Sequence, residues 1–307
     1  MKLADVAGSG KSVHVNDLGD DKALCKEIQA RLTALGCLDP KPDGIFGAVS
    51  KLTLALFASQ MKLTYDDKVT GPIATALLER KSGTFLPMQP GNDVAGRIAT
   101  YMGRNGQFFA RLPGFLTIVY LEGADPDGRP NADAADRWND LRLVLRRNAK
   151  GTPEVAFSAL ATTEPGRFYT AVKPLSSRGA ARIAFGQFKA WRVGTHHPHL
   201  LPPRRHEALT QALPITVFRD KNKDGIRPGD ATQTGVFGIN QHSGLDQSLK
   251  SIGKASAGCL VGRVDADHKA FMKLVKTDPR FRQASKGYTF MTSVIAGDDL
   301  AKQVPLA

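Results

Sequence analysis

The sequence predicts an α+β protein with a small helical N-terminal domain and a larger, mostly β C-terminal domain. Its 307 residues exceed what one hydrophobic core usually serves. Apolar residues recur at helical spacing early in the chain, whereas short β-type runs punctuated by Gly, Pro and Asp follow Pro113. We therefore divide the chain into an N-terminal tail (1–17), a helical module (18–80), a linker with a short helix (81–109) and a C-terminal domain (110–307).

Composition excludes several classes of protein. Hydrophobic residues make up 42% of the chain and charged residues 23%, as in ordinary globular proteins. There is no run of about 18 apolar residues, so we expect no membrane-spanning helix. Residues 1–21 lack the apolar centre that a secretory signal needs.

The charge of the chain predicts a polyanionic partner or surface. Lys and Arg number 42 against 29 Asp and Glu, which gives a net charge of +13. The basic residues are spread along the chain and are not interleaved with aromatic residues, as a stacking platform for nucleic acid requires. An anionic cell wall or outer membrane accounts for the charge as well as nucleic acid does.

Two short helical units are expected in the helical module. Apolar residues between Leu24 and Leu35 recur at helical spacing, and Gly36 follows them where a terminating glycine belongs. A second helix is expected over residues 49–57. The turn at residues 43–48 is echoed 24 residues later at 67–72, and each copy leads into a helix. Such units bury their apolar faces by packing together as a small bundle.

This module resembles the peptidoglycan-binding domain that accompanies many wall hydrolases. The similarity rests on Leu38-Asp39, on Asp43-Gly44-Ile45-Phe46-Gly47 and on Val69-Thr70-Gly71-Pro72. It implies a three-helix, glycan-binding fold whose motif residues are Asp43, Gly44, Phe46 and Gly47. The alternative is a small helical domain without a ligand.

Short runs in the C-terminal domain predict β-strands and a helix. A helix is expected over residues 264–275, and another in the linker over 94–102. The β-type runs are residues 115–120, 141–145, 215–218, 236–239 and 288–291.

The sharpest chemical feature is His242-Ser243-Gly244 followed by Ser256-Ala257-Gly258-Cys259. A thiol is mostly protonated near neutral pH, so a catalytic cysteine needs a nearby base, and histidine is the usual one. Flanking glycines let backbone N–H groups approach a substrate carbonyl. An activated Cys259 is expected to alkylate fast near neutral pH, unlike Cys25 and Cys37. The alternative is a buried structural cysteine beside a satisfied histidine.

The histidine and the cysteine lie 17 residues apart (242 to 259). This order and spacing resemble the L,D-transpeptidase catalytic domain, whose motif is His-Gly followed by Ser-x-Gly-Cys, with similarity over residues 110–297. Residues 161–170 resemble the Thr-Pro-x-Gly strand of that family. The chain departs from the motif at Ser243, which precedes the glycine, and at Val261, which replaces an arginine.

The resemblance implies a role for individual residues. Cys259 is the expected nucleophile and His242 its base. Ser256 is expected to orient the imidazole through its backbone carbonyl, and the amides of Gly258 and Cys259 to hold the oxyanion. The expected substrate-binding residues are Thr163, Pro165, Gly166, Tyr169, His197, Gly244 and Arg263.

The segment 220–225 begins like a calcium loop, with Asp220, Asn222 and Asp224 as weak candidate ligands. A calcium loop needs a bidentate carboxylate at position 12, whereas Asp230 falls at position 11. A polar hairpin turn is therefore the favoured interpretation.

The segment 194–199, together with His206 and Glu207, suggests zinc. Its prolines and mixed spacing do not match a helical His-Glu-x-x-His site, so a substrate-lining loop is favoured, in which His197 or His206 assists catalysis. A zinc peptidase is kept as a separate hypothesis. We expect no cofactor and no resident metal.

Together these features predict an enzyme whose cysteine cleaves or exchanges amide bonds of the peptidoglycan stem peptide through an acyl-enzyme. We expect a phage endolysin or a delivered wall hydrolase that acts in the periplasm and reaches it through a lysis or secretion system. Its expected partners are peptidoglycan and the anionic envelope, not nucleic acid. The alternatives are a wall-synthetic L,D-transpeptidase and a non-catalytic wall-binding virion or structural protein.

Overall fold

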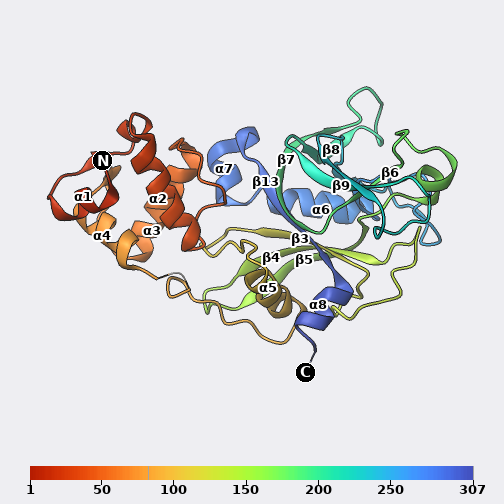
Figure 1. The fold of residues 1–307 in the computed structure, drawn as a ribbon, viewed down its shortest axis with the longest axis horizontal. Helices are drawn as coiled ribbons and strands as arrows, with labels where there is room; N and C mark the ends of the chain where they lie inside the picture. The colour runs from red at the N-terminus through yellow and green to blue at the C-terminus, as the bar shows by residue number, and fades with distance from the viewer. Residues whose placement is uncertain (82, 307) are drawn as a thin grey trace.

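A computed structural model describes residues 1–81 and 83–306 of the chain. Ser82 of the expected linker and Ala307 of the expected C-terminal domain lie outside the described residues. The fold is α+β: the N-terminal helices lie at one end, and a β-barrel with helices around it forms the other (Figure 1). No helix in the described part of the chain is long and apolar enough to span a bilayer.

The N-terminal end is a helical bundle that includes the first residues of the chain. Leu3 and Val6 are fully buried in its core, so residues 1–17, expected as a tail, are part of this bundle. A two-stranded ribbon of β1 (Val13–His14) and β2 (Lys68–Val69) closes it. Its helices are α1 (Leu3–Gly8), η1 (Asp17–Gly19), α2 (Lys22–Ala34), α3 (Ala48–Gln60) and α4 (Gly71–Glu79).

The segment expected as a linker is packed on both ends of the molecule. Phe85 is buried in the N-terminal core, and Ala110, Leu112 and Phe115 return to that core. Between them α5 (Val94–Arg104) provides the helix expected at 94–102, and it packs against the barrel and near the C-terminal helix (Figure 1).

The barrel is closed, with the strand order β11-β12-β5-β4-β3-β13-β7-β8. The pairs β11–β12 and β13–β3 are parallel, and the other neighbours are antiparallel. The barrel strands are β3 (Thr117–Glu122), β4 (Asp140–Arg147), β5 (Pro153–Thr162), β7 (Gly186–His196), β8 (His206–Gln211), β11 (Gln241–Ser243), β12 (Leu260–Gly262) and β13 (Phe290–Ala296).

A smaller sheet of order β10-β9-β6 accompanies the barrel. Its strands are β6 (Ala180–Ile183), β9 (Ile215–Asp220) and β10 (Ala231–Gly235). The remaining helical elements are η2 (Phe168–Val172), α6 (Asp265–Val275), α7 (Pro279–Ala284), η3 (Ser285–Gly287) and α8 (Gly297–Gln303).

One expected strand is absent. Residues 236–239 are irregular, because the N–H groups of Phe237 and Ile239 donate to the side-chain oxygen of Gln211, each at 3.0 Å, rather than to a neighbouring strand. The expected runs at 115–120, 141–145, 215–218 and 288–291 overlap β3, β4, β9 and β13, and 264–275 overlaps α6.

A buried ionic cluster joins the N-terminal bundle to the barrel. The carboxylate of Asp39 accepts from Arg280 and, at 2.9 Å, from the hydroxyl of Tyr288. Arg280 also donates to Asp278 at 2.6 Å, and its guanidinium lies 4.6 Å from the ring centroid of Phe115. These side chains are almost fully buried, so the contact between the two ends is dry and directional.

Replacing Arg280 with alanine removes the cation between two buried carboxylates. Asp39 keeps Lys189 at 3.4 Å, but Asp278 loses its cation. Leaving a buried charge unpaired costs about 3–5 kcal/mol, so we expect the free energy of unfolding to fall by that amount in a urea titration. The exposed neighbour Arg282 provides the control, since Arg282→Ala is expected to change stability by no more than about 0.5 kcal/mol. Equal stability of the two variants would contradict this role of Arg280.

Candidate active site

Cys259 and His242 lie at neighbouring parallel strands of the barrel. The register of β11 and β12 pairs Gln241 with Leu260 and His242 with Val261. Because side chains alternate along a strand, Cys259 and His242 project from the same face as diagonal neighbours. Both line a cleft of about 900 Å³. The structure therefore brings together the two residues expected to be nucleophile and base.

A hydrogen bond determines which nitrogen of His242 carries the proton. Its Nδ1 lies 2.8 Å from the carbonyl oxygen of Ser243. A carbonyl only accepts, so Nδ1–H is the donor and Nε2 remains as the basic atom. The carbonyl that holds Nδ1 is that of Ser243 and not, as expected, that of Ser256, which accepts from the N–H of Gly166 at 2.9 Å.

The pair is neutral at rest. Burial, with a further contribution from His196, lowers the pKa of His242 well below its usual value. Burial raises the pKa of the Cys259 thiol to about 11, although the N–H of Asn240 donates to the sulfur at 3.4 Å. These shifts favour a resting thiol beside a neutral imidazole over a resting thiolate, and the rate at which Cys259 alkylates near neutral pH stays a prediction.

The loop before Cys259 is held by its own serine. The Ser256 hydroxyl donates to the carbonyl of Cys259 at 2.9 Å and accepts from the N–H of Gly258 at 3.1 Å. The Gly258 amide is therefore occupied, and the expectation that it holds an oxyanion is wrong. Gly258 has φ 122°, and a Cβ there would overlap the carbonyl oxygen of Ala181, so only glycine fits.

Two residues that sequence reasoning missed brace the same loop. The indole N–H of Trp138 donates to the carbonyls of Ser248 and Ser251, each at 3.0 Å. The carboxylate of Asp136 accepts from the N–H of Gly253 at 2.8 Å. Both come from the segment before β4, and no local pattern links that segment to a loop more than a hundred residues later.

His196, from the end of β7, stacks on His242. The ring centroids are 3.9 Å apart and the planes differ by 10°. The Nδ1 of His196 lies 3.1 Å from the side-chain nitrogen of Asn240, whose backbone N–H reaches Cys259. Asn240 was not expected as a site residue, whereas His196 belongs to the segment 194–199 that was expected to line the substrate site. Together they connect His242 to Cys259.

The histidines do not form a metal site. His206 donates from Nδ1 to the carbonyl of Pro203 at 3.0 Å and accepts at Nε2 from the N–H of Ser243 at 3.2 Å, so both of its nitrogens are occupied. His197 is exposed and packs its ring 3.8 Å from that of His196. Within residues 1–81 and 83–306, the histidine nitrogens do not converge as a ligand set. This geometry disfavours the zinc-peptidase hypothesis.

A buried arginine lies behind the strands of the site. Arg142 donates from Nη2 to the carbonyls of His242 and Leu260, each at 3.1 Å, and from Nε to the hydroxyl of Tyr120 at 2.5 Å. Its Nη1 lies 3.0 Å from Nδ1 of His268. Among the described residues no carboxylate pairs with Arg142, so its charge is met by carbonyl and hydroxyl oxygens and one imidazole.

The expected substrate-binding residues divide into two groups. Tyr169, His197 and Gly244 line the cleft. Thr163, Pro165 and Gly166 are buried in the protein, and Arg263 donates to the carbonyl of Gln247 at 2.9 Å. Contact of these four with a ligand in the cleft was expected, but they are not among the residues that line it.

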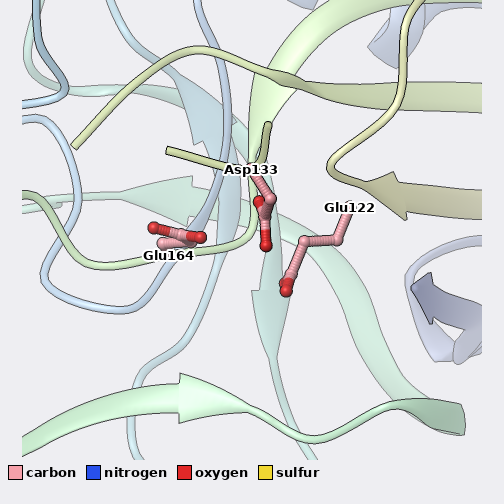
Figure 2. A group of neighbouring side chains, drawn as sticks. All are labelled: Glu122, Asp133 and Glu164. Carbon is pink, nitrogen blue, oxygen red and sulfur yellow. The ribbon is translucent and has the colours of Figure 1, made fainter. Parts of the chain in front are cut away.

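Three carboxylates converge on one side of the barrel, as Figure 2 shows for Glu122, Asp133 and Glu164. Their ligand atoms lie within 4.8 Å of one another. The space already holds positive charge: Arg227 donates to Glu122 at 2.6 Å, and Arg182 donates to Glu122 at 2.9 Å and also to Glu164. We interpret the group as a buried ion network in which guanidinium groups take the place of a metal.

This network is connected to the loop between β11 and β12 (residues 244–259), called the nucleophile loop here because it carries the expected nucleophile Cys259. Asp140 joins it through Thr163, whose N–H donates to the Asp140 carboxyl at 2.6 Å. The Thr163 hydroxyl lies 2.9 Å from the same carboxyl and also contacts Glu122. Burial raises the pKa of Asp140 to about 7 and that of Glu164 to about 9, so these carboxyls retain protons that exposed ones would lose. Two residues further along, Gly166 contacts Ser256.

The motif at residues 43–47 builds a turn in the N-terminal bundle. The side-chain nitrogen of Gln29 donates to Asp43 at 2.8 Å, and Phe46 is buried. These residues hold the link between α2 and α3 together, which is a structural role. The large hollow of this end, about 1060 Å³, lies elsewhere and is lined by Lys11 and Arg80 among others.

The segment after β9 forms a hydrogen-bonded turn. The carboxylate of Asp220 accepts from the N–H groups of Asp224 and Gly225 at 3.1 and 3.0 Å. The side-chain nitrogen of Asn222 donates to Asp224 at 2.6 Å. Because backbone and amide donors occupy these oxygens, the structure favours the polar turn over the calcium loop.

Comparisons with known proteins add little to this picture. No family model and no curated protein matches the chain. Among solved structures, the chain is similar to a fused Zn-dependent amidase/peptidase/peptidoglycan-binding domain-containing protein from Clostridium acetobutylicum ATCC 824. The two are 12% identical, the match covers 93% of this chain and 100% of that chain, and the TM-score is 0.30. A likeness this distant carries no argument about function.

The raised thiol pKa predicts how Cys259 alkylates. We expect the rate with iodoacetamide to climb steadily from neutral pH toward about 11, without a plateau near neutrality. Mass spectrometry of tryptic peptides follows the three cysteines separately. Cys25 and Cys37 are fully buried and serve as internal controls that react only in denaturant. A rate that levels off near neutral pH would show a stabilised thiolate instead.

The protonated carboxyl of Glu164 predicts a pH-dependent effect of Glu164→Gln. Between the usual pKa of 4.5 and about 9, the folded protein holds a proton that the unfolded chain releases, so this carboxyl lowers stability as pH rises. Glutamine resembles the protonated form at every pH. The melting temperature of the variant relative to wild type should therefore increase across this window, whereas the exposed Glu79→Gln should show a constant difference.

Proposed function

We propose that this protein is a cysteine acyl-transfer enzyme that cleaves or exchanges amide bonds in peptidoglycan stem peptides. The observation that supports it best is the shared face of Cys259 and His242 in one cleft, with His242 Nδ1 bound to the Ser243 carbonyl. That bond leaves Nε2 as the only basic atom of the ring. The resemblance of the two motifs to L,D-transpeptidases indicates the substrate class.

The reaction begins from the neutral pair. As the Cys259 sulfur attacks the amide carbonyl, the thiol proton passes to Nε2 of His242, and a C–S bond forms while the C=O bond opens to an oxyanion. The Ser243 carbonyl accepts from Nδ1–H and so stabilises the imidazolium that results. Collapse of the oxyanion breaks the C–N bond, and the proton on Nε2 moves to the leaving amine.

The acyl-enzyme is then released by a second proton transfer. Water or an amine attacks the thioester, and Nε2 of His242 takes its proton. Collapse of the second oxyanion breaks the C–S bond, and the proton on Nε2 moves to the departing Cys259 sulfur, which restores the neutral thiol and imidazole. The N–H of Cys259 has no acceptor among the described residues, which makes it the donor for the oxyanion in both steps. Since burial lowers the pKa of His242 well below its usual value, activity should persist into mildly acidic solution.

The N-terminal bundle gives the enzyme a second means of engaging the wall. Its sequence resembles a peptidoglycan-binding domain, and the ionic cluster at Asp39 and Arg280 fixes it against the barrel. The net charge of +13 favours an anionic envelope. We therefore propose a wall hydrolase of the endolysin type, or one delivered by a secretion system, that acts in the periplasm.

Digestion of purified Gram-negative sacculi tests this proposal. Wild type is expected to release or trim stem peptides, and mass spectrometry of the soluble muropeptides identifies the bond. Cys259→Ala should abolish the reaction, a loss of at least about 10³-fold, because no other group forms the acyl-enzyme. Products linked to an added amine would indicate exchange rather than hydrolysis.

Two controls make the result decisive. Cys37→Ser changes a buried thiol at the other end of the molecule and should leave the products unchanged once folding is verified. A chelator should have no effect on wild type. If Cys259→Ala digests as well as wild type, the cysteine mechanism is refuted, and a wild type that does nothing to sacculi refutes the proposed substrate.

A further inference from the structure

The cleft around Cys259 is lined by positive charge without any compensating acid. Among the described residues that line it, Arg204, Arg219 and Lys254 are cationic, and there is no Asp or Glu. None of these three forms an ion pair elsewhere in the described part of the chain. By contrast, the buried arginines of the barrel, Arg142, Arg182 and Arg227, donate to oxygen atoms of the protein. The cleft itself is lined by cations that no described carboxylate neutralises.

Arg219 is held in a fixed orientation at the cleft wall. It lies on β9, and its Nε donates to the side-chain oxygen of Gln233 at 2.8 Å. Its guanidinium lies 4.6 Å from the ring centroid of Phe237, which also lines the cleft. With Nε bound and the plane supported by an aromatic ring, the terminal N–H groups of Arg219 are left without an acceptor in the described residues.

A second cation lies close to this guanidinium. Burial lowers the pKa of Arg219, and the charge of Arg178 lowers it further. Two neighbouring arginines repel each other unless an anion lies between them. Lys254, on the nucleophile loop, also lines the cleft, with its ammonium 4.4 Å from the ring centroid of Phe168.

We propose that Arg219 forms a carboxylate-binding subsite of this cleft, with Arg178 and Lys254 adding positive potential. A guanidinium fork with free terminal N–H groups matches the two oxygens of a carboxylate. The acyl donor is then a peptide with a free carboxylate near the bond that Cys259 attacks. Assigning the carboxylate to the acyl donor rests on the proposed function; the anion site itself does not.

Two alkylating reagents that differ in charge test the subsite without any wall substrate. Iodoacetate carries a carboxylate and iodoacetamide does not, and with both the sulfur of Cys259 displaces iodide. The rate with iodoacetate divided by the rate with iodoacetamide, both at one alkaline pH and low salt, measures how strongly the cleft attracts the carboxylate. Arg219→Gln should lower this ratio by roughly threefold to tenfold, mainly by slowing iodoacetate.

Matched variants separate a local site from net charge. Arg282→Gln removes the same charge at an exposed position on α7 and should leave the ratio as in wild type. Arg219→Lys keeps the charge but loses the pair of terminal N–H groups of the guanidinium. Its ratio should therefore lie between that of Arg219→Gln and that of wild type. Lys254→Gln, at an exposed position, should also lower the ratio. A ratio that is the same in wild type, Arg219→Gln and Lys254→Gln overturns the proposal.

A substrate pair connects the subsite to the reaction. For a stem peptide on which wild type is active, amidating the carboxylate next to the scissile bond should lower kcat/KM about tenfold in wild type and little in Arg219→Gln. Equal losses in both enzymes would contradict the assignment of this carboxylate to Arg219. If sacculi are not digested but the alkylation ratio depends on Arg219, the proposed function fails while the anion site stands.

Discussion

The guanidinium of Arg142 lies behind the cleft, inside the barrel and away from any described carboxylate. Burying a charge is costly unless it is fully hydrogen-bonded, and here the acceptors include the carbonyls of His242 and Leu260 on two neighbouring strands. Those carbonyls both reach Nη2 only while β11 and β12 keep their register. The same register places Cys259 diagonally from His242, so the geometry of the site depends on this one buried cation.

Other buried ions repeat this arrangement around the site. On one side Arg182 and Arg227 bind Glu122 and its neighbours, and that network reaches the nucleophile loop through Gly166. At the far end Arg280 fixes the N-terminal bundle on the barrel. Each of these buried arginines donates to oxygen atoms of the protein. The cleft cations Arg204, Arg219 and Lys254, by contrast, form no ion pair with a described residue. This contrast gives the open side of the site its preference for anions.

Local patterns predicted much of the fold, and they singled out Cys259 and His242, which the structure places in one cleft. Helices α2, α3 and α6 follow from apolar residues at helical spacing, and β3 and β4 from runs of apolar residues. The strand predicted at 236–239 is absent, because the N–H groups of this segment donate to the side chain of Gln211 instead of to a neighbouring strand. The ring of His242 bonds to the carbonyl of its neighbour Ser243, whereas the carbonyl of Ser256 accepts from Gly166, which is distant in the sequence.

The sequence by itself determined which groups are available for chemistry: a cysteine after a glycine, a histidine 17 residues before it (242 to 259), and an excess of cations. Only the tertiary structure decided how those groups behave. The proton stays on the Cys259 thiol and off His242 because burial in the barrel disfavours both charged forms. That burial comes from His196 and other residues on distant strands, which no local pattern of residues brings together.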